Sequence, residues 1–163
     1  MKRRLIMLVL CIVMLGVIAM PASAESTASR VESYVNVNSD GDCLVSMTVT
    51  LHLESAYESL AFPLPIQATN ITMNGNSVRV TNTGSANEVD IARATNGLIG
   101  DFTMRFDYTI PEAVKVIPFE NEDGKQSAYL QLELPLLSGF SLPIDTLNFT
   151  VTFPSDQWAG RNR

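Results

Sequence analysis

Beyond residue 24, the sequence contains one cysteine and one histidine that could form a nucleophilic pair, Cys43 and His52. A Cys–His pair works when the imidazole takes the thiol proton, so the two side chains must touch. Cys43 and His52 lie nine positions apart on one predicted strand. An odd separation places them on opposite faces of that strand. We therefore expect Cys43 to pack as a small buried hydrophobe and His52 to lie on the polar face.

A second candidate is calcium binding by residues 36–41, which read Asn-Val-Asn-Ser-Asp-Gly. This segment matches the opening half of an EF-hand loop, which needs a bidentate glutamate at its twelfth position. Met47 occupies that position. The same residues are explained by a strand that ends in an Asp40-Gly41 hairpin turn, and we favour this interpretation. The acidic loop at 120–124 has no ligand spacing and is expected to be a solvated turn.

Other catalytic classes find little support in the sequence. No G-x-S-x-G motif presents a serine, and one His with one Cys cannot build a zinc site. Two facing carboxylates, as in glycoside hydrolysis, remain open because the fold sets their distance. Sugar sites use aromatic platforms, however, and Trp158 is the one tryptophan. We therefore predict no catalytic, cofactor-binding or metal-binding residue. The alternative is a carboxylate-dependent hydrolase of cell-wall or sugar substrates.

The elements that would position these residues are β-strands, because apolar and polar residues alternate along most of the chain. Residues 43–53 are the clearest case, with an odd-numbered apolar set and an even-numbered polar set. A second hairpin is expected at Asn74-Gly75-Asn76. Prolines at 63, 65, 111, 118, 135 and 143 are expected at sheet edges and in loops, because proline cannot donate to a sheet ladder. The predicted strands are 31–37, 43–54, 60–62, 71–73, 77–80, 88–91, 102–110, 128–134 and 147–153.

Seven to nine such strands predict an all-β fold, an antiparallel β-sandwich of the Ig-like or a similar Greek-key type. A closed barrel is the alternative. We expect the sandwich to span residues 31–154, after a flexible lead-in at 25–30. Residues 155–163 would form a C-terminal tail, or the point at which a longer chain is truncated.

The N-terminus has the three parts of a signal peptide. Lys2 to Arg4 are basic, Leu5 to Met20 are apolar, and Ala22-Ser23-Ala24 supplies the small residues that signal peptidase requires. We predict cleavage after Ala24, so that residues 1–24 are removed and the protein is secreted or extracytoplasmic. An uncleaved membrane anchor is the alternative.

Net charge and cysteine content bear on the kind of partner and on the source of the protein. Removing residues 1–24 leaves 139 residues with eight basic and 17 acidic side chains, a formal charge of −9. Such a surface repels phosphate backbones, which argues against nucleic-acid binding. Cys43 would be alone, so no intramolecular disulfide could form, which favours a bacterial source. The sequons at Asn70 and Asn148 would be glycosylated only in a eukaryotic secretory route.

Three stretches of the C-terminal third carry a resemblance to a known family. They are Phe102–Ile110, Tyr129–Leu134 and Leu142–Pro154, whose last part combines Pro143-Ile144, an alternating strand and Pro154. This pattern resembles the extracytoplasmic β-domain of the DUF2207 family. The members of this family are predicted bacterial membrane proteins of unknown function. The resemblance covers residues 30–154 and implies a fold and a location. Members of that family continue with more strands and a membrane-spanning helix, which do not appear before Arg163.

These observations predict a non-enzymatic interaction or structural module at the bacterial cell envelope. Its partner would be an unidentified protein or another component of the envelope. Membrane association would arise only through an uncleaved signal peptide or a missing C-terminal segment.

Overall fold

The computed structural model describes residues 25–94, 99–120, 122, 124–135, 137 and 139–154. The predicted signal peptide and the tail at 155–163 lie outside the described residues. The elements are β1 (Thr27–Val37), β2 (Cys43–Leu53), β3 (Ala61–Pro65), β4 (Thr69–Met73), β5 (Asn76–Ser77), β6 (Thr81–Asn82), β7 (Ala86–Asp90), α2 (Ile91–Ala94), β8 (Gly100–Ile110), β9 (Val114–Glu120), β10 (Gln126–Leu132) and β11 (Leu147–Thr152).

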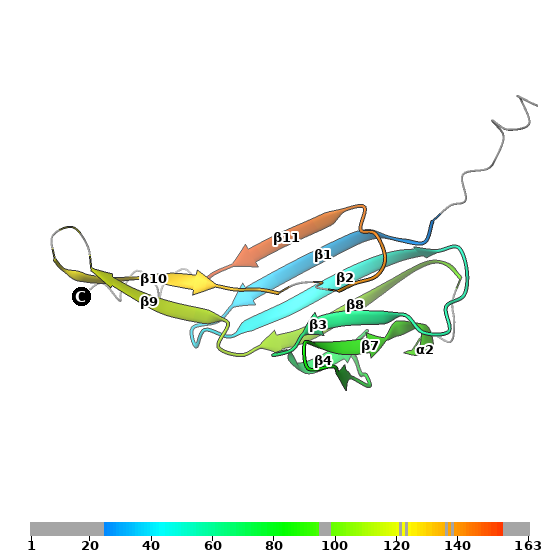
Figure 1. Ribbon diagram of the computed structural model, residues 1–163, viewed down its shortest axis with the longest axis horizontal. Helices are drawn as coiled ribbons and strands as arrows, with labels where there is room; N and C mark the ends of the chain where they lie inside the picture. The colour runs from blue at the N-terminus through cyan, green and yellow to red at the C-terminus, as the bar shows by residue number, and fades with distance from the viewer. Residues whose placement is uncertain are drawn as a thin grey trace, which may run out of the picture.

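The largest layer is a six-stranded sheet with the order β11-β1-β2-β8-β4-β5 (Figure 1). Neighbouring strands are antiparallel except for β1 and β11, which are parallel. The predicted all-β class is confirmed. The parallel pair is a departure from a purely antiparallel sandwich, and it arises because the connection after β10 leads the chain back so that β11 runs beside β1 in the same direction.

A second sheet, with the order β3-β7-β6, packs on one face of the first. Phe62 of β3 stacks on Phe106 of β8 with ring centroids 4.6 Å apart and planes 6° from parallel. Odd residues of β2 are buried between the layers, and so are the even residues of β8 from Met104 to Ile110, as the alternation predicts. Both sheets are open among the described residues, as in a sandwich and unlike a closed barrel.

Both hairpins predicted from turn residues are confirmed. Asn38 and Asp42 close the β1–β2 turn through a 2.9 Å backbone hydrogen bond, and Gly41 has φ +92°. Asn74 and Gly75 both have positive φ in the β4–β5 turn, the backbone that this Asn-Gly pair favours.

The predicted boundaries fail in two places because tertiary contacts override local composition. β1 begins at Thr27, so the expected flexible lead-in at 25–30 is mostly strand. Ala28 donates from its backbone N–H to the Pro143 carbonyl at 2.8 Å, and its own carbonyl accepts from Asp145 at 3.0 Å. The predicted strand at 77–80 ends at Ser77, because the chain there leaves one sheet and resumes in the other as β6.

Three prolines lie on strands at sheet edges, as expected of a residue that cannot donate to a ladder. Pro63 and Pro65 belong to β3, and Pro118 belongs to β9. Both strands have a free side among the described residues, so a missing N–H costs no ladder bond there. With β6 and β9, which were not predicted, the described residues form 11 strands instead of seven to nine.

The described residues include one short helical turn, α2, and no helix among them is long and apolar enough to cross a bilayer. Asp90 caps this turn, since its Oδ1 accepts from the Arg93 backbone N–H at 3.2 Å. Desolvation, the largest single influence, raises the pKa of Asp90, but hydrogen bonds from Arg93, Leu60 and Ser59 together with the charge of Arg93 outweigh it and hold that pKa below its usual value.

Candidate functional site

Cys43 and His52 lie on opposite faces of β2, as their spacing predicts. The Cys43 thiol is fully buried in the core, while His52 lies on the outer face of the sheet. Desolvation, with a smaller contribution from the charge of Asp42, raises the pKa of the Cys43 thiol. A buried thiol with a raised pKa holds little thiolate, so it is a poor nucleophile.

His52 is held between two carboxylates. Its Nδ1 lies 2.5 Å from Asp101 of β8, and its Nε2 lies 2.7 Å from Glu54 just beyond β2. The hydrogen bond to Asp101, followed by the one to Glu54, raises the pKa of His52. Both ring nitrogens therefore donate in the favoured, protonated form. The group ties β2 to β8 electrostatically and leaves no ring nitrogen free to accept a substrate proton.

The loop considered for calcium forms a turn that uses its own oxygens. Asn38 Oδ1 accepts from the backbone N–H groups of Asp40 and Asp42, both at 3.0 Å. This is an Asx-type turn, in which the side chain stabilises the backbone. Among the described residues, no group of three or more His, Cys, Asp or Glu side chains could hold a metal ion.

The same turn anchors a two-stranded hairpin formed by β9 and β10, which we call the arm. Asp42 Oδ1 accepts from the Glu112 backbone N–H at 2.9 Å, and the Gly41 carbonyl accepts from Val114 at 3.1 Å. Glu112 has φ +50°, an unusual backbone for a residue other than glycine, and it redirects the chain from β8 into β9. The β1–β2 turn thus fixes the direction in which the arm leaves the sandwich.

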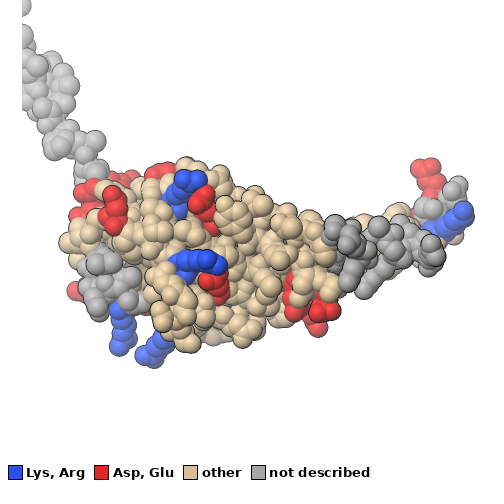
Figure 2. All heavy atoms as spheres, turned by 180° about the vertical axis from the view of Figure 1, so that it is seen from behind, with Lys and Arg blue, Asp and Glu red and all other residues tan. Residues whose placement is uncertain are grey.

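The arm extends beyond the end of the sandwich (Figure 1), and both of its faces carry apolar side chains. Val116 pairs with Leu130 on one face, whereas Phe119 and Tyr129 contact each other on the opposite face, with ring centroids 6.1 Å apart. All four of these side chains are between 40% and 53% exposed. Figure 2 shows charged side chains gathered at the far end of the arm. The arm therefore carries accessible apolar side chains on both faces, and its tip is charged.

Sequence reasoning missed this surface because it looked for one polar face on each strand. In β9, apolar residues occupy both faces, from Val114 to Phe119, so the alternation test gives no signal. A continuous apolar run without strict alternation could have identified a strand there, although not its exposure.

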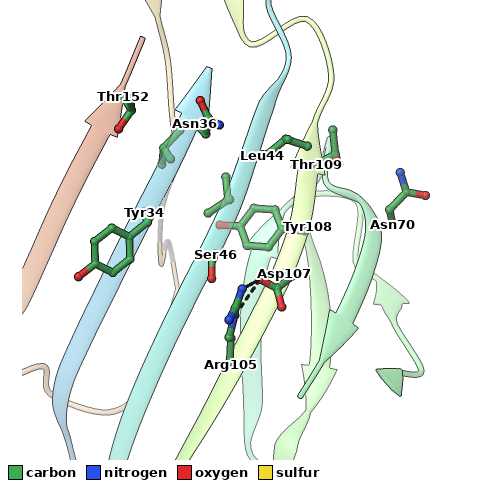
Figure 3. Close-up of a pocket in the computed structure, with 12 residues that line it drawn as sticks. Tyr34, Asn36, Leu44, Ser46, Asn70, Arg105, Asp107, Tyr108, Thr109 and Thr152 are labelled. Carbon is green, nitrogen blue, oxygen red and sulfur yellow. Dashed lines mark hydrogen bonds and ion pairs between the residues drawn. The ribbon is translucent and has the colours of Figure 1, made fainter. Parts of the chain in front are cut away.

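A shallow groove of about 470 Å³ lies on the outer face of the six-stranded sheet (Figure 3). Tyr34 of β1, Ser46 of β2 and Asp107 of β8 form one row across it. Asp107 is the groove's carboxylate, and Arg105 neutralises it at 2.8 Å. A pair of facing carboxylates is therefore not assembled in this groove.

Two other cavities lie around the second sheet. The larger, of about 690 Å³, contains one carboxylate, Asp90, together with Arg79 and Arg93. The smaller, of about 240 Å³, is lined by residues of β3 and the β6–β7 turn and contains no carboxylate. Neither of them provides the two acidic groups that glycoside hydrolysis requires.

Comparison with known proteins gives one family match. The model of the N-terminal domain of predicted membrane proteins, DUF2207, matches residues 27–162. No curated protein matches the chain. Among solved structures, an M1 zinc metallopeptidase from Deinococcus radiodurans overlaps 80% of the chain, with a TM-score of 0.40 and 16% identity. A mutant of that enzyme bound to a Tyr-Ser-Ala substrate gives a TM-score of 0.41 and 17% identity. The chain covers 33% of each of these structures.

Proposed function

This chain belongs to the DUF2207 family of predicted membrane proteins, and we propose that its β-sandwich is a non-catalytic interaction module outside the bacterial cytoplasmic membrane. In this proposal, residues 1–24 direct export and are removed, and the acidic sandwich is presented to the cell envelope. Its partner is a protein or another component of the envelope, and not nucleic acid.

The observation that carries the proposal is the arm. Large apolar side chains gathered on an accessible surface mark interaction sites, and aromatic residues are enriched where proteins bind one another. The arm presents Val116, Phe119, Tyr129 and Leu130 on a hairpin whose root is fixed by Asp42. A fixed root lowers the entropy cost of binding, since the surface is ordered in advance.

The chemistry of the remaining candidates supports a non-catalytic role. The Cys43 thiol is buried, and both nitrogens of His52 are engaged by carboxylates. Each of the three cavities contains at most one carboxylate. The Cys43 thiol is thus not accessible as a nucleophile, His52 is not free to act as a general base, and no cavity among the three supplies a pair of carboxylates.

The test compares the exported chain with an arm variant in which Val116, Phe119, Tyr129 and Leu130 are all changed to serine. Its matched control is Tyr34→Ser with Leu44→Ser, which removes two exposed apolar groups from the outer face of the sheet. Each protein is mixed with purified bacterial envelope fragments and sedimented. We expect the wild type and the control to sediment with the fragments and the arm variant to remain in solution.

Two results would overturn the proposal. Equal sedimentation of the arm variant and the control would remove the arm from the interaction. Release of soluble sugar or peptide fragments from the envelope by the wild-type chain would instead support the alternative, a carboxylate-dependent hydrolase.

A further inference from the structure

The strand β11 forms one edge of the six-stranded sheet, and we infer that this edge pairs with β11 of a second copy of the chain. The two copies would be related by a two-fold axis and joined in an antiparallel manner. The inference does not depend on the arm or its partner.

The backbone of β11 has a free side. β1 is its neighbour, and the Thr146 carbonyl accepts from the Val31 N–H at 2.8 Å. Consecutive residues of a strand direct their N–H and C=O groups to opposite sides, so even-numbered residues of β11 bond to β1. Leu147, Phe149 and Val151 therefore direct their backbone groups outward, where no other described strand pairs with them.

This edge lacks the usual features that prevent strands from associating. Natural edge strands are protected by charged residues, prolines, bulges or a covering loop. Residues 147–153 read Leu-Asn-Phe-Thr-Val-Thr-Phe and contain no charge and no proline, and their register with β1 is continuous. In a chain with 17 acidic residues, a neutral edge of this length is where two copies can meet without repulsion.

The side chains of β11 give this edge an exposed apolar face. Leu147 and Phe149 lie in register with Val31 and Ser33, so they project from the face that carries the core. Val31 is fully buried there, whereas Leu147, Phe149 and the following Phe153 are 45% to 53% exposed. The apolar face of the sheet thus continues past the layer that covers it, and a second copy would shield it.

The sequence of β11 is self-complementary in an antiparallel pair. If Thr150 lies opposite its own copy, Leu147 faces Phe153 and Phe149 faces Val151, so every apolar side chain meets another. On the other face, Asn148 lies opposite Thr152, and Thr150 opposite Thr150, pairs that favour cross-strand association. The outward backbone groups of Phe149 and Val151 then face each other, as an antiparallel ladder requires.

The first experiment measures the mass of the exported chain by light scattering over a dilution series. We expect a dimer that dissociates on dilution. Phe149→Pro removes an outward N–H and leaves the bonds of β11 to β1 in place, so this variant is expected to be a folded monomer by circular dichroism. The arm variant is expected to remain dimeric, which separates this inference from the proposed function.

A charge pair at Thr150 tests the two-fold axis itself. Thr150→Lys places two like charges opposite each other, which should raise the dimer Kd by about fivefold. The matched control, Thr81→Lys, adds the same charge at the exposed strand β6 and should leave the dimer unchanged. Mixing Thr150→Lys with Thr150→Glu should restore association as a mixed dimer.

The inference fails if the wild-type chain is monomeric throughout the dilution series. It also fails if the wild-type dimer is unaffected by both Phe149→Pro and Thr150→Lys, because a different surface would then join the copies.

Discussion

Two regions of this protein are built from similar strands but treat their apolar faces in opposite ways. In the covered region, under the second sheet, β2 buries its whole apolar side and β8 buries its own from Met104 to Ile110. There Phe62 stacks on Phe106. In the open region, which consists of the arm and β11, apolar side chains of the same kinds remain accessible. An alternating pattern therefore identifies a strand and its apolar face, but it does not tell whether another element of the same chain packs on that face.

The covered region is expected to give the largest response to mutation. Val49 is fully buried on β2, whereas Thr50 lies on the outer face and hydrogen bonds to Thr103 at 3.1 Å. Val49→Asp buries a carboxylate without a partner, at a cost of several kcal/mol, and should prevent stable folding. Thr50→Asp should cost about 1 kcal/mol or less, as surface changes usually do. Thermal melts give both values.

Cys43 provides an independent readout of the same comparison, because its thiol is protected only while the two layers remain packed. Rapid alkylation at neutral pH is expected in Val49→Asp and slow alkylation in Thr50→Asp and the wild type. Similar melting temperatures for the two variants would mean that the two faces of β2 do not differ as the structure indicates.

The root of the arm should respond less strongly than the core. Asp42→Ala removes the acceptor for the Glu112 N–H and should loosen the arm by about 1 kcal/mol, the usual net value of one hydrogen bond. Amide hydrogen exchange at Glu112 and Val114 measures the change. Asp40→Ala is the matched control, since Asp40 is exposed in the same turn and its own backbone N–H makes the bond to Asn38. Equal exchange in both variants would show that Asp42 does not fix the arm.

Much of the covered region could be predicted from sequence, because local chemistry and tertiary structure agree there. The Asp40-Gly41 and Asn74-Gly75 turns and the long strands were predicted correctly. The opposite placement of Cys43 and His52 followed from their odd spacing. In each case the signal lies within a few residues of the feature that it predicts.

The open region was harder to predict because its structure depends on distant segments. β9 lacks a polar face and contains Pro118, so its sequence alone does not indicate a strand. It is recognised as one only through its pairing with β10. The parallel pairing of β1 and β11 joins positions more than 100 residues apart, and no local pattern encodes such a partner. The carboxylates beside His52 also show this dependence on distant segments. Glu54 is close to His52 in sequence, whereas Asp101 lies next to it only because of the register between β2 and β8.

The smallest predicted effect concerns the pH dependence of this link between β2 and β8. Asp101 and Glu54 raise the pKa of His52 above its usual value of 6.5. A raised pKa in the folded state means that protonated His52 stabilises the fold. This contribution is complete below about pH 6.5 and is lost as the pH rises through the higher folded value. The effect should be small, since exposed ion pairs contribute little and are screened by salt.

His52→Gln isolates this contribution, because glutamine keeps hydrogen-bonding capacity but does not titrate. The difference in melting temperature between the wild type and His52→Gln should favour the wild type most at pH 6 and shrink towards pH 9, whereas Thr48→Gln, on the same face of β2, should give a difference that does not change with pH. Added salt should reduce the His52 effect at low pH. A difference that grows as the pH rises would contradict the assigned direction, since it would mean that neutral His52 is the form that the folded protein prefers.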